Sequence, residues 1–167
     1  MSGVSAARVK DAVLKEFPDA TVVMKNLDYE AWNTVQGFHH WDIKQMLRWV
    51  RSASHRYSSV YLIGASAGGF ASILVGAASG VDGVLTYQAQ TERSHRPQAL
   101  DPRYSDVMGF IEGKVPLWLY VDPEGVKEHS PAQANRIAHL PLVNVRQMQP
   151  RAFAQLVDEG IFTRQLS

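Results

Sequence analysis

Apolar residues follow two different spacings along this chain, and the alternation of these spacings predicts the order of its helices and strands. Val9, Val13 and Phe17 recur at four-residue intervals, which predicts an amphipathic helix over residues 4–16 that Pro18 ends. Other segments are short, continuous apolar runs, which are typical of strands buried on both faces of a sheet. Helical and strand patterns therefore alternate from one end of the chain to the other.

Five continuous apolar runs predict strands, over residues 20–26, 59–65, 82–89, 115–121 and 142–148. Five further segments predict helices, over residues 40–53, 68–79, 104–112, 130–140 and 151–160. Strands that alternate with helices favour a parallel sheet covered by helices on both faces. We therefore expect an α/β fold, a three-layer α/β/α sandwich around a mainly parallel sheet of about five strands, in one domain spanning residues 1–167.

Composition narrows the class of protein further. The 167 residues are 46% hydrophobic and 20% charged, as in a globular protein. The formal net charge is +1 and the basic residues are scattered along the sequence, so we expect no nucleic-acid partner and no docking on an anionic membrane. Cysteine is absent, which excludes disulfides and thiolate chemistry. No apolar segment is long enough to span a membrane, and residues 2–17 carry charges where a signal peptide has an apolar run, so we expect a cytoplasmic protein.

The expected topology places a functional site at one edge of the sheet. In open parallel sheets, ligands bind outside the carboxyl ends of the strands. The connections at that edge are residues 26–40, 65–68, 90–103, 122–130 and 148–151. Ser66 lies in the second connection and is the first candidate for chemistry.

The segment around Ser66, VYLIGASAGGFASILVG (60–76), has a serine between small residues where a strand meets a helix. In a nucleophile elbow the serine has a strained backbone, so the residues two before and two after it, here Gly64 and Gly68, must be small. Free amides of the following helix would stabilise an oxyanion, with Ala67 as one donor and Asn26 as the second. The alternative is a packing loop rich in small residues. A dinucleotide-binding turn is disfavoured, because G-x-G-x-x-G is absent.

These motifs resemble those of the α/β-hydrolase superfamily. Within it, the chain is similar to small lidless members found beside bacterial polysaccharide-biosynthesis and glycosylation genes. GASAGGFAS (64–72) and YQAQTE (87–92) stand where those proteins have GxSxGGxxA and a strand ending in Pro-Gln-Thr, and DYEAWNTVQGF (28–38) resembles their early loop. The resemblance implies a Ser–His–acid triad with Asp122, after the strand at 115–121, as the acid. A turn in Asp-Pro-Glu-Gly would equally explain this residue.

The histidine that the resemblance implies is missing from its expected place. Residues 149–153 begin with Gln149, Pro150 and Arg151, and none of these acts as a general base near neutral pH. The histidines that fall on the site-edge connections are His39, His40, His95 and His129. We rank His129 first as the base, then His95, then His40. For each, the alternative is a surface or capping histidine.

The connections at the same edge also contain candidate substrate-binding residues. Trp32 is the aromatic residue expected to line a substrate pocket, together with His95 and His40. The histidines lack the HxxxH or H-x-H spacing with a carboxylate that a metal site needs, so we expect no metal and no cofactor. The first strand is expected at an exposed sheet edge, which predicts either a homodimer or a cover supplied by the N-terminal helix.

Three functions remain open from the sequence. The first is a serine esterase or acyl-transfer enzyme acting on a small ester or acylated substrate. The second is a noncatalytic binding or assembly protein that has kept the elbow and lost the base. The third is a phosphate- or carboxylate-binding module that uses the helix N-terminus without covalent chemistry.

Overall fold

A computed structural model describes residues 6–23, 40–93, 102–125, 131–148, 158 and 160. The chain forms two compact units, one made of Met1–Asn26 with Gln149–Ser167 and the other of Leu27–Met148. Each unit is described by itself. The expectation of a single domain over residues 1–167 stays a prediction.

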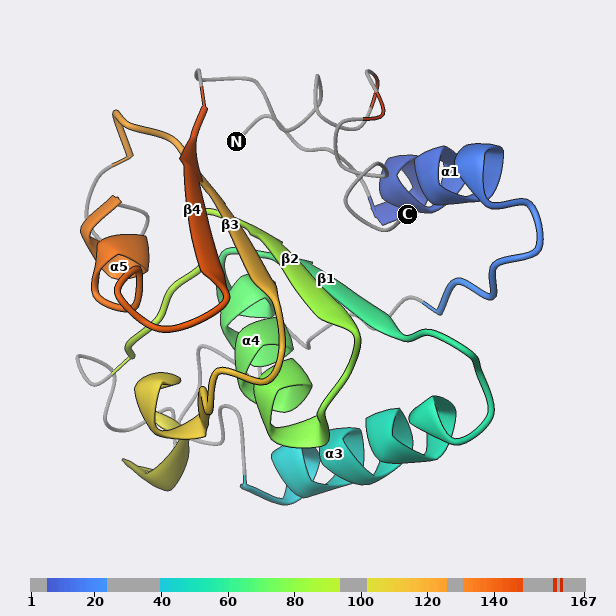
Figure 1. The fold of residues 1–167 in the computed structure, drawn as a ribbon, viewed down its shortest axis with the longest axis horizontal. Coiled ribbons are helices and arrows are strands. Elements are labelled where there is room, and N and C mark those ends of the chain that lie inside the picture. Colours follow the sequence, from blue (N-terminus) through green and yellow to red (C-terminus); the bar gives the residue numbers. More distant parts are fainter. Residues whose placement is uncertain are drawn as a thin grey trace. The chain divides into compact units, whose positions relative to one another are not determined.

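The larger unit is built on a parallel sheet. Its strands are β1 (Tyr61–Ala65), β2 (Gly83–Tyr87), β3 (Leu117–Val121) and β4 (Val143–Gln147), which lie in the order β1-β2-β3-β4 (Figure 1). All neighbouring strands are parallel, so their carboxyl ends meet at one edge. The predicted α/β class with a parallel sheet is confirmed.

One predicted strand differs from the structure. Of residues 20–26, the described part (20–23) is not in a strand, and residues 24–26 lie outside the described residues. Val23 is 54% exposed, so it does not have the burial that the apolar run suggested. An amide of Ala20 donates to the carbonyl of Phe17 (3.0 Å), which shows that a turn after the first helix uses the start of this run. Among the described residues, the sheet therefore has four strands.

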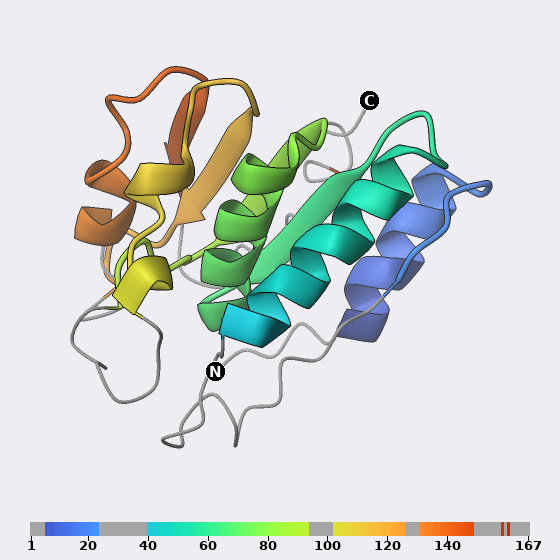
Figure 2. The ribbon, with the colours of Figure 1, turned by 90° about the horizontal axis from the view of Figure 1, so that it is seen from below.

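Helix α4 (Ala67–Ser79) is the central helix of the larger unit. It packs on β1 and β2, and α3 (His40–Ser54) packs against it, so that the two helices lie side by side (Figure 2). Phe70, Ile73 and Leu74 of α4 are fully buried, as an almost wholly apolar helix requires. The helix ends at Gly80, whose φ of 69° only glycine adopts without strain and whose amide donates to the carbonyl of Gly76.

Two predicted helices are shorter than expected. The segment 104–112 forms two 3₁₀ turns, η1 (Pro102–Tyr104) and η2 (Met108–Phe110). The segment 130–140 forms α5 (Pro131–Asn135) and then turns, with the amide of Leu140 bound to the carbonyl of Ile137. Ala134 and Ile137 belong to the same buried cluster as α4, so α5 covers the same face of the sheet at β3.

The smaller unit contains α1 (Ala6–Glu16), which matches the helix predicted over residues 4–16. Val13 is buried, and the amide of Phe17 donates to its carbonyl before Pro18 ends the helix. Of the helix predicted over 151–160, the structure describes only Asp158 and Gly160. Within the part of the chain that is described, each helix falls short of the length and hydropathy that crossing a bilayer requires.

Candidate functional site

Ser66 occupies the junction between β1 and α4 in a backbone conformation that serine rarely adopts. Its φ is 52° and its ψ is −121°. Such a conformation costs about 1–3 kcal/mol and persists only where the surroundings fix it. Two backbone hydrogen bonds do so here: the amide of Ser66 donates to the carbonyl of Tyr87 (3.0 Å), and the amide of Phe70 donates to the carbonyl of Ser66 (3.1 Å).

Gly64 is required by packing at this junction, and Gly68 is not. A Cβ at Gly64 would lie 2.4 Å from the carbonyl oxygen of Gly68 and 2.6 Å from Oγ of Ser72. A Cβ at Gly68 would meet nothing within 4 Å. The expectation that both glycines avoid a collision is therefore correct for Gly64 and wrong for Gly68, because only the first glycine faces the helix backbone.

The Ser66 hydroxyl and the Ala67 amide make no hydrogen bond within α4. The side chain of Ser66 makes no capping hydrogen bond to α4, although serine at this position commonly does so. The amide of Ala67 is in the first turn of the helix, where amides have no partner within the helix, and none of the described residues accepts a hydrogen bond from it. A serine hydroxyl and an oxyanion donor thus belong to adjacent residues.

The chain that leaves β2 runs beside Ser66. Gln88 has a φ of 48°, and its amide donates to the carbonyl of Tyr120 (2.8 Å) at the end of β3. The amide of Gln90 lies 3.5 Å from the carbonyl oxygen of Ser66, and Ala89 is the residue that a Cβ at Gly69 would strike, at 2.6 Å. The ends of β1 and β2 thus form one tightly packed edge.

Asp122 follows β3 at the same edge and takes part in a turn. Its Oδ1 accepts a hydrogen bond from the amide of Glu124 (2.9 Å), and its carbonyl accepts one from the amide of Gly125 (3.0 Å). Burial raises the pKa of the Tyr87 phenol above its ordinary value, and the Asp122 carboxylate raises it further. Asp122 is therefore a turn residue with its carboxylate close to the end of β2.

A buried polar cluster, which sequence reasoning missed, holds the chain after β2 in place. Oε1 of Gln133, in α5, accepts hydrogen bonds from the amides of Thr91 (2.8 Å) and Glu92 (3.1 Å), while Oγ1 of Thr91 donates to the carbonyl of Gln133 (2.6 Å). Arg136 donates to Thr91 Oγ1 (3.2 Å) and to Asp106 Oδ2 (2.6 Å). Thr91 is fully buried. The partners are 30 to 45 residues apart, so local patterns carry no signal of this cluster.

Next to this cluster, Arg93 is buried with only 1% of its surface exposed. Its Nη1 donates to Oε1 of Gln90 (2.7 Å), which is 2% exposed, and its amide donates to the carbonyl of Ser105. This contact links the buried Arg93 to Gln90, whose amide lies 3.5 Å from the carbonyl oxygen of Ser66.

The other predicted site residues are not placed against Ser66. Asn26, Trp32, His95 and His129 lie outside the described residues. His40 is the first residue of α3, and its side chain is likewise not described. His55 and His139 are exposed after α3 and α5, before the amino ends of β1 and β4, at the edge opposite Ser66. The predicted roles of the first five residues stay predictions.

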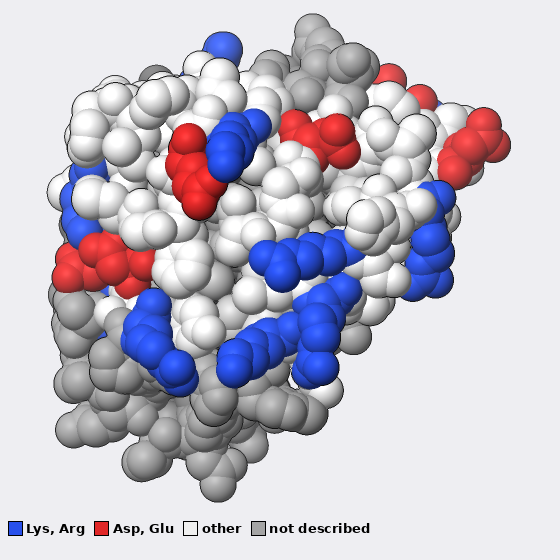
Figure 3. Space-filling view, turned by 60° about the horizontal axis from the view of Figure 1, so that its bottom comes forward, with Lys and Arg blue, Asp and Glu red and all other residues white. Residues whose placement is uncertain are grey.

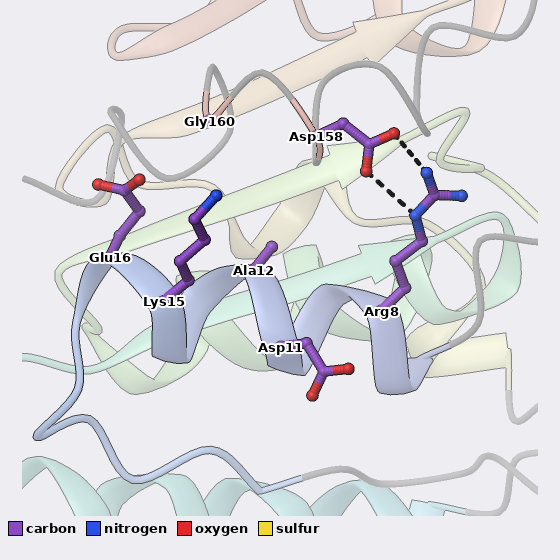
Figure 4. Close-up of a pocket in the computed structure, with 7 residues that line it drawn as sticks. All are labelled: Arg8, Asp11, Ala12, Lys15, Glu16, Asp158 and Gly160. Carbon is purple, nitrogen blue, oxygen red and sulfur yellow. Dashed lines mark hydrogen bonds and ion pairs between the residues drawn. The ribbon is translucent and has the colours of Figure 1, made fainter.

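A separate hollow of about 250 Å³ lies in the smaller unit (Figure 4). Arg8, Lys15, Glu16 and Asp158 are among the residues that line it, and the guanidinium of Arg8 pairs with the carboxylate of Asp158. Because both partners of that pair are about half exposed, it adds little to stability. In the described residues, His, Asp and Glu nowhere gather in a group of three that could hold a metal.

Comparison with known proteins gives the fold. No protein-family model and no curated protein sequence matches the chain. A solved structure from Xanthomonas campestris pv. campestris, provisionally described as a hydrolase of the α/β superfamily, is similar with a TM-score of 0.53. The match covers 92% of this chain and 88% of that protein at 15% identity. At that identity the likeness shows an α/β-hydrolase-like fold.

Proposed function

We propose that this chain is a serine hydrolase of the esterase or acyl-transfer type, with Ser66 as nucleophile and a small ester or acylated molecule as substrate. The observation that carries the proposal is the strained backbone of Ser66 (φ 52°, ψ −121°) together with the absence of a capping hydrogen bond from its side chain. Helix capping would not need such strain, whereas displaying a hydroxyl at a strand–helix junction does.

The proposed reaction starts from the serine and the amide at the junction of β1 and α4. Oγ of Ser66 attacks the substrate carbonyl carbon, and its proton passes to a histidine. The amide of Ala67 donates to the oxyanion that forms, with Asn26 as the proposed second donor. The alcohol leaves with the proton, and water or an acceptor hydroxyl then takes the acyl group from Ser66.

The base and its orienting group complete the proposal. His129 is the first candidate, followed by His95 and His40, and Trp32 is the candidate pocket wall. Asp122 can orient an imidazole through Oδ2, since Oδ1 accepts the hydrogen bond of the Glu124 amide. The similar fold of the Xanthomonas protein, which is described as a hydrolase, supports the proposal that this chain is a hydrolase.

A noncatalytic binding protein is the second candidate, and one observation favours it. Residues 149–153 contain no histidine, and the hydrogen bonds of Asp122 are those of an ordinary turn. In that case the protein retains the strained conformation of Ser66 but has no general base to activate its hydroxyl.

An assay of p-nitrophenyl acetate hydrolysis separates the two candidates. We expect turnover by the wild-type chain, loss to background in Ser66→Ala, and a fall of 10²-fold or more in one of His129→Ala, His95→Ala and His40→Ala, in line with removal of a general base. Turnover that survives Ser66→Ala contradicts the proposal. If all three histidine variants retain the activity of the wild type, none of these histidines is the general base and that assignment is contradicted.

A further inference from the structure

Helix α3 carries a row of positive charge on its solvent side. Lys44, Arg48 and Arg51 follow one another at spacings of four and three residues, which places them on one helical face, and all three are exposed. Arg56 continues the row in the turn after the helix. In Figure 3, Lys and Arg side chains gather in the lower middle of the view, while other Lys and Arg side chains on the same face touch acidic ones.

Within the part of the chain that the structure describes, no carboxylate pairs with these four side chains. The sequence has no Asp or Glu from residue 43 to residue 81. Arg51 donates to the carbonyl of Ala78 (3.0 Å) and Arg56 to Oγ of Ser52 (2.9 Å), both neutral acceptors. Among the described residues, the cations that do pair with carboxylates lie elsewhere, namely Arg8, Lys114 and Arg136.

The same segment carries two exposed aromatic side chains, one in α3 and one in the turn after it. Trp49 is 40% exposed and Tyr57 is 48% exposed. The opposite side of α3 is anchored in the core through Ile43 and Val50, which are 0% and 2% exposed. Packing therefore fixes the helix with its basic side outward.

We propose that the α3 basic face, defined by Lys44, Arg48 and Arg51 with Arg56 in the turn after the helix, docks on the anionic headgroups of a lipid membrane. The headgroups of a membrane form a plane, so a straight row of cations on α3 can contact several of them at once. The phosphates of a nucleic-acid duplex instead follow a curved surface, which fits a straight row less well. Tryptophan and tyrosine favour the headgroup level, where one end of the ring is apolar and the other is hydrated. This docking does not depend on chemistry at Ser66.

The strength of docking follows from the charges. Each Lys or Arg near an anionic surface strengthens association by about fivefold, and salt screens the attraction. We therefore expect binding to vesicles of equal parts phosphatidylglycerol and phosphatidylcholine that weakens as salt rises, and no binding to phosphatidylcholine alone.

Vesicle sedimentation with charge-reversed variants tests the proposal. Lys44→Glu with Arg48→Glu should lower the partition coefficient by on the order of tenfold or more. The matched control, Lys15→Glu with Lys114→Glu, makes the same change of net charge at exposed positions outside α3 and should retain most of the binding. Thermal unfolding of both variants verifies that they are folded.

Three results would overturn the proposal. The first is wild-type protein that does not sediment with the anionic vesicles. The second is an equal loss in the α3 and control variants, which would make net charge the cause. The third is binding to a duplex or single-stranded oligonucleotide that is tighter than vesicle binding and is lost in the α3 variant, which would make a nucleic acid the partner.

Discussion

At the scale of single residues, the candidate site depends on Ser66 being kept in a conformation that its own side chain disfavours. The positive φ brings its Cβ close to the following carbonyl oxygen, as in any left-handed residue. Backbone hydrogen bonds to Tyr87 and from Phe70 compensate for this strain. The free-energy cost of this strain can therefore be measured by comparing the unfolding free energies of variants that carry glycine or alanine at position 66.

Ser66→Gly should be more stable than Ser66→Ala by about 1 kcal/mol. Both variants remove the hydroxyl, but only glycine removes the Cβ that strains the backbone. Chemical denaturation of the two proteins measures the difference. Equal stability would mean that Ser66 is relaxed in solution.

Gly64→Ala and Gly68→Ala form a second matched pair. The alanine methyl at position 64 would collide with the carbonyl of Gly68, so we expect a loss of about 1–3 kcal/mol in unfolding free energy. At position 68 the space is open within α4, so the same change should be neutral or slightly stabilising. Equal losses at both positions would contradict the described junction.

The phenol of Tyr87 gives a pH-dependent prediction. Its pKa is raised in the folded state, so folding favours the protonated phenol. The stability that this provides is complete below the ordinary pKa of 10.0 and is lost as pH rises through the higher folded-state pKa. Melting temperatures between about pH 9 and pH 11 should fall less steeply for Tyr87→Phe than for the wild type, and parallel curves would contradict the assignment.

At the scale of elements, α5 acts as a support for the chain after β2. Gln133 accepts two backbone hydrogen bonds from Thr91 and Glu92 through one oxygen, and Arg136 links Thr91 to Asp106. Buried amides that lose such an acceptor retain their full cost of desolvation. In the same segment, the amide of Gln90 lies near the carbonyl oxygen of Ser66.

Gln133→Leu should lower the free energy of unfolding by about 1–3 kcal/mol, because it leaves two amides without an acceptor. Gln133→Glu keeps the acceptor oxygen and should recover most of the loss. Hydrogen exchange of the Thr91 and Glu92 amides reports the same contact directly. Fast exchange in the leucine variant and slow exchange in the glutamate variant are expected, and identical exchange in both would show that Gln133 is not the acceptor.

The sequence predicted these elements unequally. β2, β3 and α4 were predictable because each is an apolar run that the fold buries, whereas β1 and β4 were predicted correctly although their residues are only partly buried or exposed. The run at 20–26 has as many apolar residues as the one at 142–148, yet a turn uses Ala20 and Val23 is exposed, so apolar content alone did not separate the two. The contact of Gln133 with Thr91 joins positions 42 residues apart, which no local pattern encodes.

At the scale of the whole molecule, charge is distributed less evenly than its total suggests. The net charge of +1 led to the expectation of scattered basic residues, yet helical spacing collects Lys44, Arg48 and Arg51 on one face of α3. The signal was present in the sequence as a stretch without acidic residues. It becomes visible once the residues are placed on a helix, because sequence order alone does not show which side chains share a face.

The most direct test of the account is whether Ser66 is an activated nucleophile. Purified protein is incubated with a fluorophosphonate, and intact mass followed by peptide mapping locates any adduct. We expect one adduct per chain, on Ser66, and no adduct in Ser66→Ala. An unmodified wild-type protein, or an adduct that persists in Ser66→Ala, would contradict the claim that this junction displays a catalytic serine.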